Sequence, residues 1–202
     1  MRTSIYTIVA AACLTAMMIG CRTAPKSAEA KEDLRSGGQR AVDRMTAADP
    51  DLRDVIDNGH GYTIFPKVGK GGLIVGGAYG RGIVYEQGEM IGYADLTQAS
   101  VGAQIGGQTY SELIVFQTAD ALDRFRNNQL EFAATASAVI IESGAAKAAE
   151  FNDGVAIFVQ PRAGAMAEAS VGGQKFTFVS DDAARAAGRP TTRSSSTTRP
   201  TP

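Results

Sequence analysis

The side chains that could carry covalent or acid–base chemistry are few in this chain. It holds two cysteines, Cys13 and Cys21, and a single histidine, His60. His60 lies in Asn-Gly-His-Gly at positions 58–61, a pattern that favours a surface turn over a general base. Transition-metal sites rely on cysteine and histidine, which are too scarce here to form one. We therefore expect neither a metal site nor a cofactor.

The carboxylates and glycine motifs do not match the signatures of an enzyme. Glu86, Glu89 and Asp95 fall near a predicted hairpin, where a solvated sheet edge explains them better than a paired acid and base. Gly69-Lys70 has neither the upstream glycine nor the following Ser or Thr of a phosphate-binding loop. The chain also lacks Gly-x-Ser-x-Gly, the turn that presents a nucleophilic serine. The protein is predicted to be non-enzymatic.

Cys21 differs from the other candidates because its surroundings predict a modification. Residues 5–19 form an apolar stretch after Arg2, with the length of a signal peptide rather than of a membrane span. The stretch ends in Met-Ile-Gly-Cys at positions 18–21, which is typical of a bacterial lipobox. In that interpretation residues 1–20 are a signal peptide and the Cys21 thiol carries acyl chains such as palmitate. The alternative is an ordinary secretory signal with an incidental cysteine.

A lipidated Cys21 places the mature protein in the bacterial envelope. Arg22, rather than an aspartate, follows the cysteine, which favours the outer membrane, facing the periplasm, if the host sorts lipoproteins as enteric bacteria do. We expect contact with membrane phospholipid through the anchor and no binding to nucleic acid. No protein partner is indicated.

Charge and composition divide the chain into four parts. Residues 49–182 hold nine basic and seventeen acidic residues, whereas residues 183–202 hold four arginines, no acid and no large apolar side chain. That tail is predicted to be disordered and either solvated or in contact with lipid phosphates. The predicted parts are a signal peptide (1–20), a linker (21–38), one domain (39–182) and the basic Ser/Thr/Pro tail (183–202).

The elements of the domain follow from turn residues and periodicity. Twelve of the 23 glycines lie between Gly69 and Gly107, among β-branched and aromatic residues, which predicts a closely packed or strongly curved sheet rather than a linker. Helices are expected from near Gln39, from Asp49-Pro50, and over residues 118–128. Strands are expected at 62–65, 73–85, 90–96, 99–107, 111–117, 132–141, 154–160, 164–171 and 174–179. The fold class is therefore α+β: a curved antiparallel sheet or sandwich with N-terminal helices and one short helix near 118–128.

Several segments, taken in order from about Gln39 to Val179, resemble the SYLF domain family, a lipid-binding domain also found in yeast and animal actin-patch proteins. The segments are Asp49-Pro50, Tyr-Thr-Ile-Phe-Pro-Lys-Val-Gly-Lys-Gly-Gly at 62–72, Gly-Gly-Ala-Tyr-Gly-Arg-Gly at 76–82, Ser-Val-Gly-Ala-Gln-Ile-Gly-Gly-Gln at 100–108, Leu-Ile-Val-Phe at 113–116, Ala-Ser-Ala-Val at 136–139, and residues 164–175. No single segment is specific, and the resemblance rests on the ordered set.

The resemblance implies phospholipid binding, directed to phosphoinositides in eukaryotic members, through basic residues of an N-terminal amphipathic helix. The residues in that region are Lys31, Arg35, Arg40 and Arg44, and the glycine-rich block adds Lys67, Lys70 and Arg81. The alternative is a structural or partner-binding envelope lipoprotein without headgroup recognition, which the acidic balance of residues 49–182 supports because an anionic bilayer repels such a surface.

Overall fold

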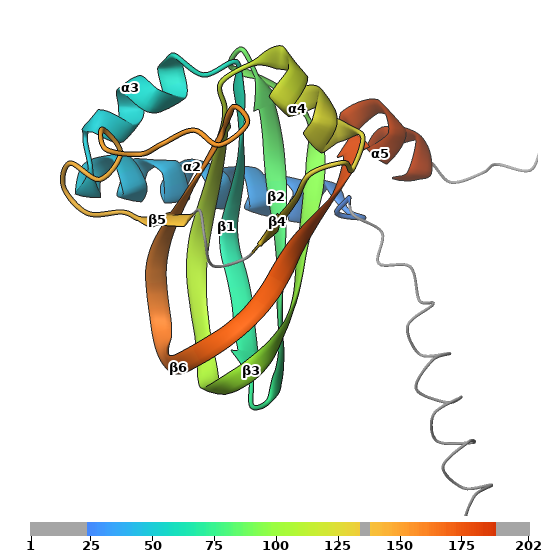
Figure 1. Cartoon of the computed structure of the whole chain (residues 1–202). Coiled ribbons are helices and arrows are strands. Elements are labelled where there is room, and N and C mark those ends of the chain that lie inside the picture. Colours follow the sequence, from blue (N-terminus) through green and yellow to red (C-terminus); the bar gives the residue numbers. More distant parts are fainter. Residues whose placement is uncertain (1–23, 134–137, 189–202) are drawn as a thin grey trace, which may run out of the picture.

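The computed structural model describes residues 24–133 and 138–188 (Figure 1). In chain order the elements are α2 (Ala28–Ala48), α3 (Asp51–Asp57), β1 (Gly61–Gly72), β2 (Val75–Glu86), β3 (Glu89–Phe116), α4 (Ala119–Arg126), β4 (Glu131–Ala133), β5 (Ala138–Ile140), β6 (Val155–Ser180) and α5 (Asp181–Gly188). The predicted α+β class is confirmed.

The sheet is built from bent strands that nest inside one another. β1 and β2 form a hairpin, and β3 wraps around it, pairing with β2 through its first half and with β1 through its second half. β6 then follows β3 along its whole length, from Gly92 opposite Ser180 to Phe116 opposite Val155. These pairings are antiparallel, but the short β5 pairs with β6 in parallel, so the sheet is mixed.

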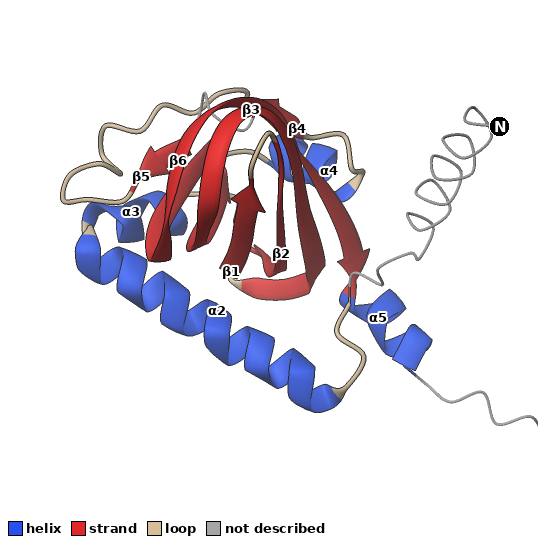
Figure 2. Cartoon of the chain, turned by 90° about the horizontal axis from the view of Figure 1, so that it is seen from below, coloured by secondary structure: helices blue, strands red, loops and turns tan. Residues whose placement is uncertain are grey.

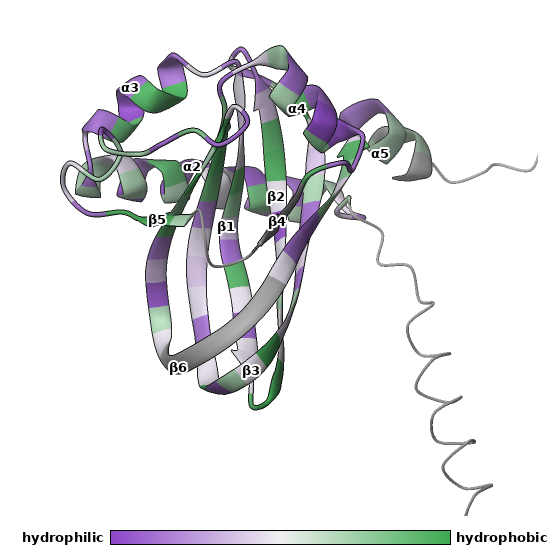
Figure 3. Cartoon of the chain, in the orientation of Figure 1, coloured by the Kyte–Doolittle hydropathy of each residue, from purple (hydrophilic) through white to green (hydrophobic). Residues whose placement is uncertain are grey.

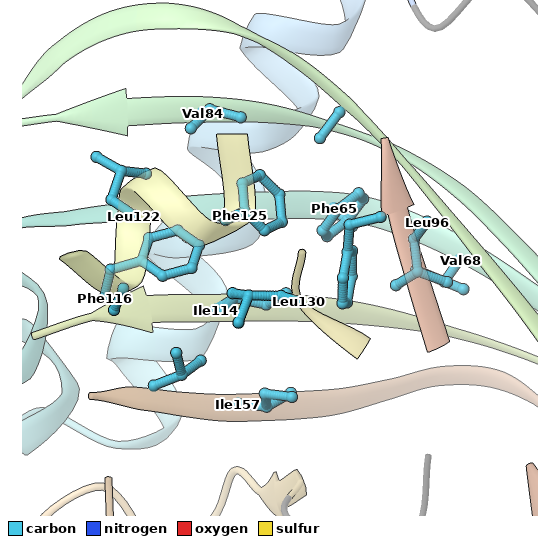
Figure 4. Close-up of a cluster of buried hydrophobic side chains, with 14 of the residues drawn as sticks. Phe65, Val68, Val84, Leu96, Ile114, Phe116, Leu122, Phe125, Leu130 and Ile157 are labelled. Carbon is cyan, nitrogen blue, oxygen red and sulfur yellow. The ribbon is translucent and has the colours of Figure 1, made fainter. Parts of the chain in front are cut away.

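Helices cover opposite faces of this sheet at one of its ends. Alternation along β3 separates the faces: Leu113 and Val115 pack in the cluster that includes α2 and α3, whereas Ile114 and Phe116 pack in the cluster that includes α4. Figure 2 shows α2 lying along one side of the curved sheet. Figure 4 shows the cluster on the other side, where Phe125 of α4 lies close to Phe116.

The strands continue past the helices to an end that we call the apex, comprising residues 71–77 of the β1–β2 hairpin and 100–107 of β3 (Figure 1). The hairpin turn fits into the bend of β3, where Gly102 and Gly106 have φ angles of 149° and 114°. These are backbone conformations that glycine adopts more readily than other residues. The glycine-rich block is therefore curved sheet, as predicted.

Several predicted helix and strand boundaries were wrong, because tertiary packing lets an element continue through glycine or proline residues that locally favour its end. α2 does not begin near Gln39 but runs through Gly37-Gly38 from Ala28, so the predicted linker is largely helical. A β-carbon at Gly38 would lie 3.2 Å from Ile64 and Ile83, and glycine thus lets the helix approach the sheet. This close packing offsets the roughly 1 kcal/mol that glycine costs a helix.

The other differences concern where strands and the C-terminal tail begin. β1 continues past Pro66 through a bulge, and the strands predicted at 154–160, 164–171 and 174–179 are one strand, β6. The tail predicted from Ala183 starts with helix α5, whose Ala184 is buried. The rest of that tail, residues 189–202, lies outside the described residues.

The capping predictions had mixed outcomes. The Thr118 hydroxyl caps α4 by accepting from the Ala121 amide at 3.3 Å, as predicted. Asp49 was predicted to cap the second helix, and its carboxylate does accept from the Asp51 amide at 3.3 Å, although Pro50 is the residue that directly precedes α3. The same carboxylate accepts hydrogen bonds from the amides of Gly144 (3.2 Å) and Ala146 (2.7 Å), which fixes the 142–149 segment against the helices.

Candidate functional site: a basic cleft beside α2

A cleft of about 430 Å³ lies where the strands emerge from beneath α2. Its lining includes five basic side chains and one acidic side chain: Arg40, Arg44, Lys67, Arg81, Arg162 and Asp33. Two other clefts of comparable size are lined mainly by acidic or neutral side chains. The cleft beside α2 is thus the described cleft best suited to an anion.

The helix supplies two of the cations through its periodicity. Gly37, Arg40 and Arg44 are spaced at three and four residues and therefore share one side of α2. Ala41, Val42 and Met45 bury the adjacent stripe against the sheet, so both arginines remain exposed at its edge. The position of Gly37 beside Pro66 brings this edge of the helix close to β1.

Two β-bulges at the same level of β3 supply two more cations. In β1, residues 66 and 67 lie opposite the single residue Ser111, and in β6 Arg162 is the extra residue between the partners of Thr109 and Tyr110. A bulge re-aims side chains, and proline, which lacks an amide hydrogen, is compatible with one. Both bulges have the order proline then cation, with Lys67 and Arg162 exposed.

Hydrogen bonds hold the two bulges together. The Pro66 carbonyl accepts from the Ser111 hydroxyl at 2.9 Å and from Arg162 Nη1 at 2.8 Å. The Gln160 amide donates to the Arg44 carbonyl at 3.3 Å, which ties β6 to α2. Arg162 therefore sits in a defined position, while its guanidinium keeps further donors for a ligand.

Arg81 is held differently, by a buried acid. Its Nε lies 3.2 Å from Asp95 Oδ1, and its Nη2 donates to the Tyr79 hydroxyl at 3.0 Å. The Tyr79 hydroxyl in turn donates to Asp95 at 3.1 Å, and burial, together with that carboxylate, raises the pKa of Tyr79. The prediction that Asp95 belongs to a solvated edge was wrong, because β3 places it directly opposite Arg81.

The remaining cations repel one another. The described residues place no carboxylate within ion-pair distance of Arg40, Arg44, Lys67 or Arg162. Partial burial lowers the pKa of Arg44, and the positive charges of Arg162 and Arg40 lower it further, against a smaller opposite effect of Asp43. An anion in the cleft would relieve this repulsion and accept charge-assisted hydrogen bonds.

The cleft brings together only part of the predicted set. Arg40, Arg44, Lys67 and Arg81 line it, but Lys31 lies 5.5 Å from the ring centroid of Tyr93 instead. Arg35 donates to the Met90 sulfur at 3.1 Å, and Lys70 lines a shallow glycine-rich surface elsewhere on the sheet. The predicted lipidation site Cys21 lies outside the described residues.

The sequence analysis did not predict Arg162 as a cleft residue. The spacing that groups Arg40 and Arg44 on one helix gives no information about a strand about 120 residues later in the chain. The only local signal for Arg162 was the proline before it, at the end of a predicted strand, as at Pro66-Lys67. The structure brings the two Pro-cation pairs together through their common neighbour β3.

Other chemistry is sparse in the part of the chain that the structure describes. His60 Nε2 lies 3.1 Å from Glu86, at the end of the sheet opposite the apex. Among residues 24–133 and 138–188, no group of three or more His, Cys, Asp or Glu side chains is arranged to hold a metal ion. Within the same residues, no helix combines the length and apolar character needed to cross a bilayer.

Comparison with known proteins gives two matches. A sequence model of the Ysc84 family, described as a Las17-binding protein actin regulator, matches residues 97–195. Beta cell expansion factor A of Aeromonas veronii is 26% identical over 159 residues, which cover 78% of this chain and 60% of that protein. The chain thus spans about 60% of the length of this relative. Of the five cleft cations, Arg162 alone falls within the family match.

Proposed function

Because residues 97–195 match the sequence model of the Ysc84 family, the family of SYLF domains, we propose that the protein binds anionic phospholipid without being an enzyme. The predicted SYLF resemblance is confirmed, and SYLF membership supports lipid binding. The finer proposal is that the basic cleft beside α2 takes the phosphate of a phospholipid headgroup. Phosphoinositide is one such headgroup, as the family resemblance implies.

One observation carries this proposal: four cations meet in one cleft without a described ion-pair partner. Exposed cations of like sign are a poor source of stability, since they repel one another. Here α2 and two bulges nevertheless converge to hold Arg44, Lys67 and Arg162 around one space. Guanidinium groups match the oxygen geometry of phosphate, and lysine adds a point charge.

The acyl anchor supplies the membrane location in this proposal. A lipidated Cys21 would lie seven residues before α2 begins at Ala28, so the domain would stay close to the envelope membrane that holds the anchor. We propose an outer-membrane lipoprotein facing the periplasm. Headgroup binding then orients a domain that is already confined to the surface, and modest affinity is sufficient because the anchor raises the local concentration.

A vesicle sedimentation assay tests the proposal. The chain from Arg22 to Pro202, made without acylation, is mixed with neutral vesicles or with vesicles containing anionic phospholipid. We expect binding to the anionic vesicles alone. In Arg44→Glu/Arg162→Glu, binding should fall by about tenfold or more, since two charge-assisted contacts are reversed.

The matched control is Arg53→Glu/Lys147→Glu, which makes the same change in net charge at two exposed positions away from the cleft. It should keep most of the binding. Equal losses of binding in the two double variants would mean that the net charge of the protein, rather than the cleft, determines vesicle binding. No binding to any vesicle would favour the alternative, a structural or partner-binding envelope lipoprotein whose membrane contact is the anchor.

A further inference from the structure

The apex exposes large aliphatic side chains that nothing in the described structure covers. Leu73, Ile74 and Val75 at the hairpin turn are 62%, 69% and 69% exposed, and Val101 and Ile105 on the surrounding bend of β3 are 62% and 63% exposed. Val75 and Val101 are direct partners across the β2–β3 pairing. Figure 3 shows the turn between β1 and β2 as a strongly hydrophobic end of the molecule.

Charge is absent from the same segments. Residues 71–80 and 96–111 contain no Asp, Glu, Lys or Arg, although the domain as a whole is rich in acids. The nearest charged positions along the paired strands are Lys70, three residues before Leu73, and Glu168 of β6, opposite Gln104. Apart from Glu168, the sequence of an apolar end followed by basic residues matches the charge order of a bilayer surface, with acyl chains inside and anionic phosphates outside.

The backbone at the apex is already hydrogen-bonded within the protein. The carbonyls of Leu73 and Ile74 accept from the amides of Gln104 (3.0 Å) and Gly102 (2.9 Å) of β3. The polar side chains turn inward as well: the Ser100 hydroxyl donates to Gln104 Oε1 at 3.0 Å, and both residues are buried. Unpaired backbone groups are the main barrier to placing irregular chain in hydrocarbon, and these contacts remove much of that barrier.

We propose that the apex inserts into the acyl-chain region of an anionic bilayer while the basic cleft holds a headgroup of the same leaflet. This inference rests on the proposed function and adds a second contact surface to it. A strand rises about 3.3 Å per residue, so Lys70 lies roughly 10 Å and Lys67 roughly 20 Å behind Leu73. Insertion by about 10 Å, within the usual depth of interfacial segments, leaves Lys70 at the headgroup boundary and Lys67 of the cleft at most about 10 Å beyond it, on the headgroup side.

A lipid surface fits the apex better than a second protein does. The exposed large side chains are five aliphatics, whereas stable protein interfaces need some 20–30 residues a side and favour Trp, Tyr and Arg. A bilayer needs no shape complementarity and accepts Leu, Ile and Val directly. Another copy of this chain is the competing occupant, and the experiment includes it.

A site-specific fluorescent label tests the inference. The chain from Arg22 to Pro202 contains no cysteine, so Ile74→Cys and, as a control on exposed α4, Asp120→Cys each give one labelling site. We expect an environment-sensitive dye at position 74 to shift to shorter wavelength on anionic vesicles and to be quenched by acyl-chain spin labels. The dye at position 120 should do neither. Ile74→Asn/Ile105→Asn should weaken vesicle binding by about tenfold or more without lowering thermal stability.

The outcomes separate this inference from the function on which it rests. If anionic vesicles bind but the dye at position 74 stays in water, apex insertion is overturned and headgroup binding in the cleft stands. If the dye shifts without vesicles as protein concentration rises, the apex meets another copy and the inference is likewise overturned. If no vesicle binds, the proposed function fails and the insertion fails with it.

Discussion

The two ends of the sheet differ in what lies on their faces. At the helix-covered end, α2 and α3 pack on one face and α4 on the other, and the largest side chains, such as Phe65, Phe116 and Phe125, are fully buried. At the apex the buried side chains are polar, such as Gln104, and the aliphatic ones are exposed. The core of the covered end therefore stabilises the fold, which leaves the apex free to be selected for contact.

The largest expected effect is the loss of a core aromatic at the covered end. Phe125 lies 5.0 Å from Phe116 and 5.4 Å from Phe176, measured between ring centroids, and it is fully buried. Phe125→Ala should lower the free energy of unfolding by about 3–5 kcal/mol, since it removes these contacts and leaves a cavity. Urea unfolding followed by circular dichroism measures it.

The apex provides the counterpart to that substitution. Ile74→Ala should change the free energy of unfolding by less than about 0.5 kcal/mol, because the side chain is 69% exposed. Comparable losses for Phe125→Ala and Ile74→Ala would remove the contrast between the two ends and imply that the apex is packed in solution.

Glu112 marks the transition between the two ends and gives a pH-dependent prediction. Burial raises the pKa of its carboxyl from 4.5 to about 7, against smaller opposite effects of the Gln174 hydrogen bond and of Lys70. A higher pKa in the folded state means that the folded protein is favoured by protonation. The contribution of Glu112 is therefore full below pH 4.5 and is lost as the pH rises through about 7, up to about 3 kcal/mol in all.

Glu112→Gln keeps the shape and removes the titration. Wild type should lose stability relative to this variant between pH 5 and pH 8, whereas the variant's own unfolding free energy should vary less. Urea unfolding of both proteins at the two pH values measures the difference. A difference that is the same at both pH values would mean that the carboxylate is solvated or paired at the top of the range.

Asp49 tests how firmly the helices hold the 142–149 segment. Asp49→Ala should cost about 1–3 kcal/mol, because it leaves the amides of Gly144 and Ala146 without their acceptor. Asp43, whose carboxylate accepts an exposed hydrogen bond from Gln39, is the control. Asp43→Ala should change stability by less than about 0.5 kcal/mol, and equal effects would contradict the anchoring role.

Two glycines separate the need for space from the need for flexibility. Gly164 has a φ of 92°, and a β-carbon there would press on the backbone of Gly107, whereas a β-carbon at Gly69 meets nothing within 4 Å. Gly164→Ala should therefore destabilise by about 1–3 kcal/mol, and Gly69→Ala should be close to neutral. Thermal unfolding compares them, and a Gly69→Ala effect as large as that of Gly164→Ala would mean that the glycines are needed for flexibility rather than for space.

Local patterns predicted much of the fold. The glycine-rich block and the Thr118 cap both describe short-range geometry, and each was confirmed. The predicted breaks at Gly37-Gly38 and at Pro66 were wrong. These residue types interrupt helices and strands in local sequence terms, but close packing of the helix and a bulge in the strand allow both elements to continue through them. Nothing local indicates that residues 155–180 form one bent strand, because that follows from pairing with β3.

Sequence patterns predicted only those residues of the candidate site that are grouped within one local segment. Helical spacing groups Arg40 with Arg44, Lys67 directly precedes the glycine-rich block and Arg81 lies within it, and all four line the cleft. Arg162 reaches it through the β3–β6 register, and Asp95 holds Arg81 through the β2–β3 register. Strand registers of this kind bring together residues that are far apart in sequence. They cannot be predicted from the periodicity of one segment.

The central claim is that the cleft binds anionic phospholipid, and the salt dependence of vesicle binding tests it most directly. Partition of the Arg22–Pro202 chain onto anionic vesicles would be measured at several salt concentrations for wild type and for Arg44→Glu/Arg162→Glu. The account predicts that wild-type binding weakens steeply as salt rises, because charge pairs at the surface are screened, and that the variant binds weakly at every concentration. Wild-type and variant curves that coincide would contradict it.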